Sequence, residues 1–120
     1  MNLNSKDELT LVFEDSRIDC LFKTFCRKRS LLVLSHLQKH TKLRYKELSK
    51  KLGNVSPSNL SSLLKQLAKE GWINRDVYGE IPPISTEYSL TKKGNELLDA
   101  IIPLCNLIIE EKDTNFTKQN

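Results

Sequence analysis

The chain has 120 residues, the usual length of a single domain, and 38% of them are apolar. It contains no apolar run of about 18 residues, so the sequence predicts no membrane-spanning helix. The first residues lack the basic region and apolar run of a signal peptide, and we therefore expect a cytoplasmic protein. Three cysteines, an odd number without metal-ligand spacing, argue against a disulfide framework or a zinc site.

The positive charge is concentrated in one part of the chain. The net charge is +4, but residues 23–51 contain ten Lys or Arg residues and a single acid, Glu47. Acidic residues outnumber basic ones on both sides of this block. Such clustering is typical of a surface that binds a polyanion, and the alternative is an ordinary solvated charged face.

Two helices are predicted in the first third of the chain. Residues 7–25 carry apolar side chains three and four positions apart, which indicates an amphipathic helix, with a break expected near Ser16. Residues 28–40, KRSLLVLSHLQKH, combine a leucine stripe with cations in the last turn, where the helix dipole favours positive charge. This segment is predicted to be the second helix.

A helix-turn-helix is predicted over residues 45–70. A two-turn helix, YKELSKKL, ends before Gly53, and glycine is a common helix stop. Ser56 is a natural N-cap and Pro57 suits the first helical position, so a second helix begins there. Leucines spaced three, four and seven apart define the buried face of that helix. They are Leu60, Leu63, Leu64 and Leu67.

The periodicity changes beyond this helix. WINRDVY and TEYSLT have the composition of strands, and the two prolines of GEIPPIS cannot pair in a ladder, so we expect a two-stranded hairpin with a stiff tip. Residues 92–112 predict a last amphipathic helix, and residues 113–120 a disordered tail. The predicted fold is mainly α (α+β), a single winged helix-turn-helix domain over residues 1–120, in which residues 28–91 form the helix-turn-helix and wing.

The exposed side of helix 57–70 is rich in hydrogen-bonding residues. Serine and asparagine are weaker helix formers than alanine by about 0.5 kcal/mol each, so their presence needs another reason. Their side chains can contact base edges in the major groove, where helix-turn-helix proteins place their second helix. The alternative is that they only cap or solvate the helix. The predicted DNA contacts of this helix are Ser56, Ser58, Asn59, Ser61, Ser62, Lys65 and Gln66.

Basic residues beside this helix are predicted to contact the phosphate backbone. The segment 27–29, RKR, is ambiguous, because it could reach the backbone or only solvate the start of a helix. On the wing, Arg75 is predicted to reach the minor groove or a phosphate, and the alternative is a salt bridge with Asp76 or Glu87. The predicted backbone and wing contacts are Lys39, Lys42, Arg44, Lys46, Lys50, Arg75, Tyr78 and Gly79.

Several motifs resemble the HxlR-type branch of the MarR-like winged-helix transcription regulators. They are RYKEL, SPSNLSSLLKQLAKEGWI, the wing VYGEIPPISTEYSLTKKG, and LC in the last helix, and the likeness covers roughly residues 26–110. The resemblance implies a homodimer that binds a specific, near-palindromic site on double-stranded DNA, with the first and last helices forming the dimer interface. The predicted interface residues are Leu9, Phe13, Leu21, Phe22, Leu97, Leu98, Ile101, Leu104, Leu107 and Ile108.

The chain departs from this family at one motif. The family usually carries a GGKW-like sequence before its second helix, where this chain has CRKR at residues 26–29. Some members also have an N-terminal cysteine that senses electrophiles or oxidants, and Cys20, about four residues nearer to the second helix than that cysteine, is one candidate sensor. Cys26 is the other candidate, because basic neighbours such as Arg27 and Lys28 favour a thiolate. The alternative is that the thiols are buried or partly buried and behave as small hydrophobes.

Two other functional classes are weighed against the DNA-binding regulator. A protein-interaction module would use the basic block to bind an acidic partner and would have no specific DNA site. An enzyme is disfavoured, because the sequence has no glycine-rich phosphate loop and no nucleophile elbow. His36 and His40 lack the carboxylate that a zinc-protease helix adds, so no metal and no other cofactor is expected.

Overall fold

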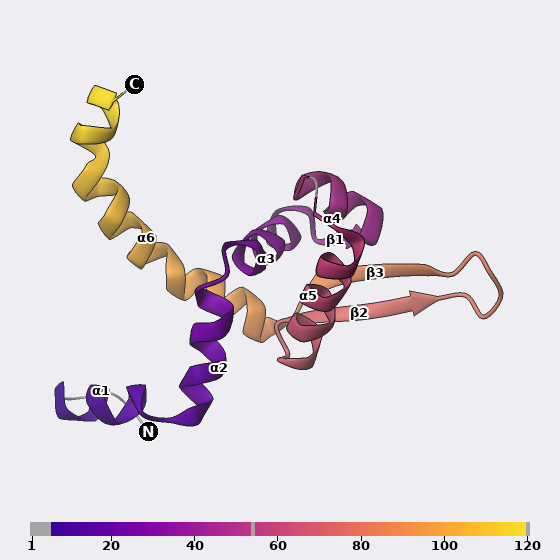
Figure 1. Cartoon of the computed structure of the whole chain (residues 1–120), viewed down its shortest axis with the longest axis horizontal. Coiled ribbons are helices and arrows are strands. Elements are labelled where there is room, and N and C mark those ends of the chain that lie inside the picture. Colours follow the sequence, from indigo (N-terminus) through magenta and orange to yellow (C-terminus); the bar gives the residue numbers. More distant parts are fainter. Residues whose placement is uncertain (1–5, 54, 120) are drawn as a thin grey trace.

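The computed structural model describes residues 6–53 and 55–119, with side chains described for residues 8–53 and 55–110. Figure 1 shows a body built on α3, α4 and α5, with the β2–β3 hairpin projecting on one side and α1, α2 and α6 extending on the other. The elements in chain order are α1 (Lys6–Phe13), α2 (Ser16–Phe25), α3 (Lys28–His40), β1 (Lys42–Arg44), α4 (Tyr45–Lys51), α5 (Pro57–Lys69), β2 (Ile73–Tyr78), β3 (Ser85–Leu90) and α6 (Lys92–Gln119).

The predicted first helix is divided into two, and the break expected near Ser16 is confirmed. Helix α1 ends at Phe13, and Asp15 takes an extended backbone conformation between the helices. The Asp15 carboxylate accepts the backbone N–H of Arg17 at 2.8 Å, which caps the start of α2. The Phe13 and Phe22 rings then pack together across the break, with centroids 5.8 Å apart.

The helix-turn-helix forms as the sequence predicts. Gly53 adopts φ 69°, a left-handed conformation that glycine reaches without steric cost, and it follows the end of α4. Ser56 caps α5, because its hydroxyl oxygen accepts the backbone N–H of Asn59 at 3.3 Å. The leucines of α5 are buried with residues of α3 and α4. This core includes Val33, Leu34, Leu37, Leu48, Leu60, Leu63, Leu64 and Leu67.

The predicted hairpin gains a third strand. The sheet is antiparallel in the order β1-β3-β2, so the short segment Lys42–Arg44 pairs with the returning strand of the wing. Leu43 lies opposite Tyr88 in this register, and both side chains are buried. This pair attaches the base of the wing to the body, because Leu43 belongs to the same core as the leucines of α5.

The start of α6 is fixed against the end of α5 by close backbone packing. The Thr91 hydroxyl donates to the Gly71 carbonyl at 2.6 Å and accepts the backbone N–H of Gly94 at 3.0 Å. A Cβ atom on Gly94 would lie 2.2 Å from the Trp72 carbonyl oxygen, a separation that no side chain permits. Glycine at this position therefore allows α6 to approach the start of β2.

Helix α6 is longer than the sequence predicts. It continues through Pro103 to Gln119, so the expected helix end at residue 112 and the disordered tail over 113–120 do not match the structure. Asn120 lies outside the described residues. None of the helices in the described part of the chain is long and apolar enough to cross a membrane.

Candidate nucleic-acid interface

Helix α5 presents one apolar and one polar side. Leu60 is 0% exposed and Leu64 and Leu67 are each 1% exposed, so the apolar side is closed to water. The Tyr45 hydroxyl of α4 donates to the Pro57 carbonyl at 3.1 Å and ties the first turn of α5 to the preceding helix. These contacts fix the rotation of α5 about its axis, and the polar side is consequently held outward.

Most of the predicted reading residues lie on this outward side. Ser61 is the exception, because it is half-buried and its hydroxyl lies 3.5 Å from the Tyr45 hydroxyl. The Ser56 hydroxyl is already used as the N-cap of the helix. The exposed residues of the predicted set are Ser56, Ser58, Asn59, Ser62, Lys65 and Gln66.

Gln66 belongs to a hydrogen-bond cluster around Glu70 that sequence reasoning missed. The Glu70 carboxylate accepts the Gln66 amide N–H at 2.7 Å, the Trp72 indole N–H at 2.8 Å and the hydroxyl of Thr24. Thr24 is buried in α2, and Trp72 begins the path into β2. One carboxylate therefore connects α2, α5 and the wing, and Gln66 is oriented within the protein. The sequence held one signal for this cluster. Trp72 directly follows Gly71, where the helix ends, and its indole N–H needs a hydrogen-bond acceptor.

The Glu70 pKa lies below its ordinary value of 4.5. Burial alone would raise this pKa, since it disfavours the charged form. The hydrogen bonds from Thr24, Gln66 and Trp72, together with the nearby charge of Arg27, outweigh that effect and stabilise the carboxylate. The cluster is therefore built around an ionised Glu70.

The predicted backbone-contacting lysines are all exposed. Lys39, Lys42, Lys46 and Lys50 lie on α3, β1 and α4 around one end of the body. Arg44 is also exposed, and its side chain lies 4.0 Å from the carboxylate of Glu87 on β3. Glu87, which was an alternative partner for Arg75, pairs instead with Arg44, and such exposed pairs contribute little to stability.

The pKa of His36 reflects the positive charge at this end of the body. Burial lowers the His36 pKa below 6.5, and the charges of Lys51, His40 and Lys39 lower it further. The His36 and His40 rings stack with centroids 6.5 Å apart. In the described residues, no group of three His, Cys, Asp or Glu side chains is arranged to hold a metal ion.

The wing places one cation beside α5 and carries an apolar tip. Arg75 lines a hollow of about 320 Å³ together with Ser61 and Lys65 of α5, so three predicted contacts meet there. Tyr78 and Gly79 are exposed farther along the hairpin, and Gly79 has φ 96°. At the tip Ile81 is 81% exposed, a feature that the sequence reading did not predict.

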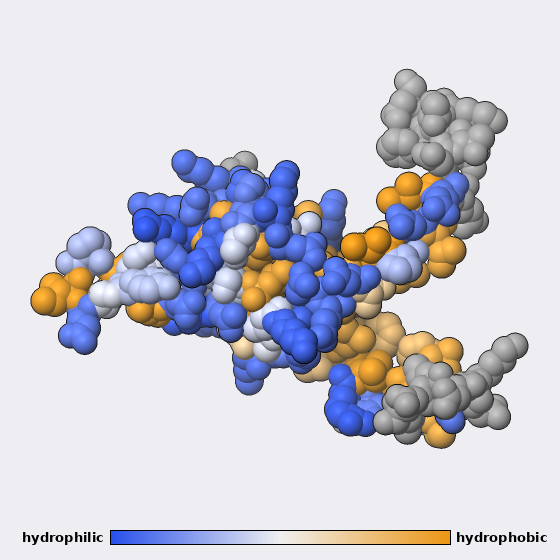
Figure 2. All heavy atoms as spheres, turned by 180° about the vertical axis from the view of Figure 1, so that it is seen from behind, coloured by the Kyte–Doolittle hydropathy of each residue, from blue (hydrophilic) through white to orange (hydrophobic). Residues whose placement is uncertain are grey.

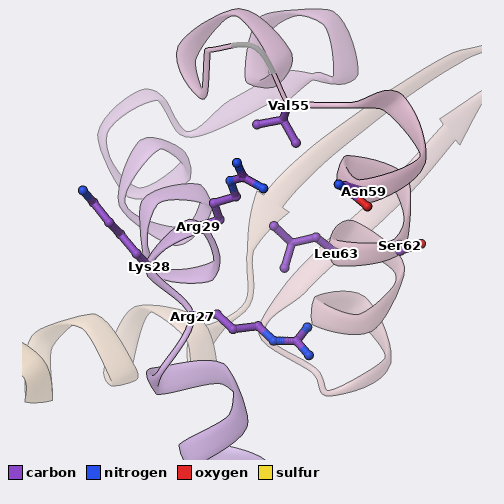
Figure 3. A pocket seen from close by; sticks show the side chains of 7 residues that line it. All are labelled: Arg27, Lys28, Arg29, Val55, Asn59, Ser62 and Leu63. Carbon is purple, nitrogen blue, oxygen red and sulfur yellow. The ribbon is translucent and has the colours of Figure 1, made fainter.

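The ambiguous RKR segment borders a second hollow beside α5. This hollow has a volume of about 420 Å³ and is lined by Arg27, Lys28, Arg29, Val55, Asn59, Ser62 and Leu63. Figure 3 shows the Arg27 and Arg29 side chains extending from the start of α3 toward α5, whereas Lys28 points away from it. Two exposed residues of the predicted reading set, Asn59 and Ser62, thus share this hollow with two arginines.

The predicted interface residues differ in their exposure to solvent. Leu98 is 8% exposed and belongs to the core, with Leu21 and Leu97 packed partly against it, so these three contact the chain's own body. Ile101 is half-buried. Figure 2 shows apolar residues along the two arms formed by α1–α2 and α6. The exposed predicted residues on these arms are Leu9, Phe13, Phe22, Leu104, Leu107 and Ile108.

The cysteines are all exposed and free. Cys20 lies in α2, Cys26 caps its end, and Cys105 lies in α6. The alternative reading, in which the thiols are buried or partly buried, is therefore wrong. Exposure makes Cys20 and Cys26 accessible to an oxidant, and sensing by either residue stays a prediction.

Two helices joined by a tight turn, with the second capped, amphipathic and flanked by a β-hairpin, define a winged helix-turn-helix protein. Residues 25–116 match the family model described as HxlR-like helix-turn-helix, and the chain belongs to that family. The family resemblance and the winged-helix fold expected from the sequence are both confirmed.

Similar proteins are named as transcriptional regulators. The uncharacterized HTH-type transcriptional regulator BH0655 of Halalkalibacterium halodurans is 36% identical over 78 residues, covering 65% of this chain and 68% of that protein. The regulator sll1512 of Synechocystis sp., also uncharacterized, is 44% identical over 80 residues, covering 67% of this chain but only 58% of that protein. The reduced form of the transcriptional regulator YodB from B. subtilis shares the fold, with a TM-score of 0.69, 21% identity, and coverage of 80% of this chain and 92% of that chain.

We expect the hydrogen bonds to Glu70 to stabilise the fold by an amount that depends on pH. Replacing Glu70 by Gln removes a charged acceptor that three donors share, and we expect a loss of roughly 1–3 kcal/mol in the free energy of unfolding at pH 7. Because folding lowers the Glu70 pKa, its contribution is fully present above pH 4.5 and is lost as the pH falls through the folded pKa. The difference between wild type and Glu70→Gln should therefore shrink below pH 4.5.

Urea denaturation at several pH values measures this difference. Glu96→Gln is the matched control, because Glu96 is exposed and its nearest cation, Lys92, is 3.9 Å away. That change should alter stability by less than about 0.5 kcal/mol. Equal effects of the two substitutions would show that the cluster does not hold the three elements together.

Proposed function

We propose that the protein is a sequence-specific, double-stranded DNA-binding transcriptional regulator that acts as a homodimer in the cytoplasm. The observation that carries the proposal is the orientation of α5, whose leucines are buried while Ser58, Asn59 and Ser62 face solvent. In this proposal α5 enters the major groove, and the wing, residues 78–86, lies on the adjacent minor groove or backbone.

Charge supports a polyanionic partner for this surface. Exposed lysines on α3, β1 and α4 lie on the elements that precede α5, and Arg75 and Lys65 share a hollow between α5 and the wing. In the proposed complex these cations neutralise phosphates and set the register, while Asn59 and Ser62 contact base edges. Gln66 has one amide hydrogen committed to Glu70, so its carbonyl oxygen and its second amide hydrogen remain for a base.

The arms support self-association. Large apolar side chains are exposed on α1, α2 and α6, including Leu11 at 59% and Leu107 at 66%. Contiguous apolar surface of this kind usually marks a protein interface, and a two-fold dimer covers the same surface on both copies. Two recognition helices would then reach half-sites about 34–36 Å apart on a near-palindromic operator.

Reading and positioning residues should respond differently to substitution. We expect Asn59→Ala to lose roughly 1–3 kcal/mol of binding free energy at one base pair of the operator and to relax specificity there. Lys46→Ala or Lys50→Ala should weaken all sequences alike and reduce the slope of log affinity against log salt by about one.

Fluorescence anisotropy with an operator selected from random duplexes, at several salt concentrations, measures both effects. Lys92→Ala is a control, because Lys92 is exposed at the start of α6 and lines neither of the hollows beside the polar side of α5. A flat salt dependence for the wild-type protein would contradict DNA binding and favour an acidic protein partner. Identical behaviour of the Asn59 and Lys46 variants would contradict the assigned roles.

A charge introduced into the exposed apolar surface of α6 tests the proposed dimer. Leu107→Asp places a carboxylate on the exposed apolar surface of α6. We expect the wild-type protein to sediment as a dimer at micromolar concentration. The dissociation constant of the variant dimer should be at least tenfold higher, which corresponds to a loss of roughly 1.4 kcal/mol in association free energy. A wild-type monomer at every concentration in analytical ultracentrifugation would contradict this part of the proposal. Glu110→Asp, a conservative change in the same helix, should leave the assembly unchanged.

A further inference from the structure

We propose that Arg29, assisted by Arg27, forms a phosphate-binding cleft that holds the DNA backbone beside the recognition helix. The cleft is the hollow of about 420 Å³ between the start of α3 and α5. This inference rests on the proposed DNA-binding function and adds to it a backbone contact from a segment whose role the sequence left open.

The side chains converge on the cleft from two elements. Arg27 and Arg29 extend toward α5, with Val55 and Leu63 forming apolar parts of the wall between them (Figure 3). Lys28, the residue between the arginines, points to the other side of α3. All three cations of CRKR therefore border the cleft, but only the two arginine side chains extend into the space beside α5.

Among the described residues, no acidic side chain neutralises the charge of Arg29. Arg29 forms no ion pair with any described residue, and the residues lining the cleft include no acid. Arg27 is partly engaged, because it also lines a neighbouring hollow with Glu70 and its charge lowers the Glu70 pKa. Arg29 is consequently the principal cation and Arg27 the auxiliary one.

A phosphate fits the chemistry of these groups. A guanidinium donates two parallel N–H bonds to phosphate oxygens, so Arg29 can hold a phosphate while Asn59 and Ser62 remain available for base edges. Asn59 and Ser62 are also exposed on the polar side of α5. A strand whose bases face α5 must pass this edge of the helix, so its backbone is the anion that the position favours.

The test compares single substitutions in the full chain. Arg29→Gln should weaken binding to the selected operator roughly tenfold and reduce the salt slope by about one, as expected for one lost charged hydrogen-bonding contact. Arg27→Gln should have a smaller effect of the same kind. Lys92→Gln removes the same charge from an exposed position that does not line the cleft, and it should leave affinity and slope within twofold of wild type.

Phosphate-ethylation interference gives the positional readout. Ethylation of one phosphate in each half-site should block the wild-type protein and no longer matter to Arg29→Gln. If Arg29 only stabilised the fold, Arg29→Gln would show the same ethylation interference as the wild-type protein. If Arg29→Gln unfolds, Arg29→Lys keeps the charge but not the bidentate geometry, and it should retain the salt slope while losing a few-fold in affinity.

The outcomes separate this inference from the proposed function. Wild-type protein that selects no operator would overturn both. Wild-type binding that Arg29→Gln leaves unchanged, with the same interference pattern, would overturn the cleft alone. Unchanged DNA binding, combined with an increase in Tm by inorganic phosphate that depends on Arg29, would also overturn it and assign the cleft to a free anion.

Discussion

The burial of the α5 leucines is the interaction on which the remaining structure depends. Leu60, Leu64 and Leu67 are almost completely removed from water, and each such burial stabilises the fold by about 1.5–3 kcal/mol. Because these side chains form one stripe, they fix the helix in rotation as well as in position. The polar side chains on the opposite side are therefore held toward solvent by a rigid helix. Such rigidity is needed to match side chains to the regularly spaced bases of a DNA duplex.

The ends of α5 are fixed by polar contacts rather than by apolar packing. At its start the Ser56 cap and the Tyr45 hydroxyl hold the first turn. At its end Glu70 accepts hydrogen bonds from Thr24 and Trp72, so the arm, the recognition helix and the wing meet at one carboxylate. A short polar network thus sets the relation between the surface proposed for self-association and the surface proposed for DNA.

The sequence predicted the elements whose signals are local. The Ser–Pro start of α5, the stop at Gly53 and the leucine spacing are confirmed, because caps and periodicity act within a few residues. Contacts between distant residues were not predictable in the same way. The pairing of β1 with β3, the Glu70 cluster and the direction of Arg29 depend on tertiary packing, and residues 27–29 had two equally consistent readings from sequence alone. Leu98 packs into the core of its own chain, which the sequence did not indicate, since an apolar residue on a helix can face the core as readily as a partner.

In the proposed function, the polar side of α5 is free in the unbound protein and covered by DNA in the complex. The most direct measurement is the alkylation rate of a Ser62→Cys thiol in a chain whose three native cysteines are replaced by serine. We expect rapid alkylation of the DNA-free protein and strong protection by the selected operator, but no protection by a duplex of unrelated sequence at high salt. A thiol that is unreactive without DNA, or one whose rate the operator leaves unchanged, would contradict the proposed function.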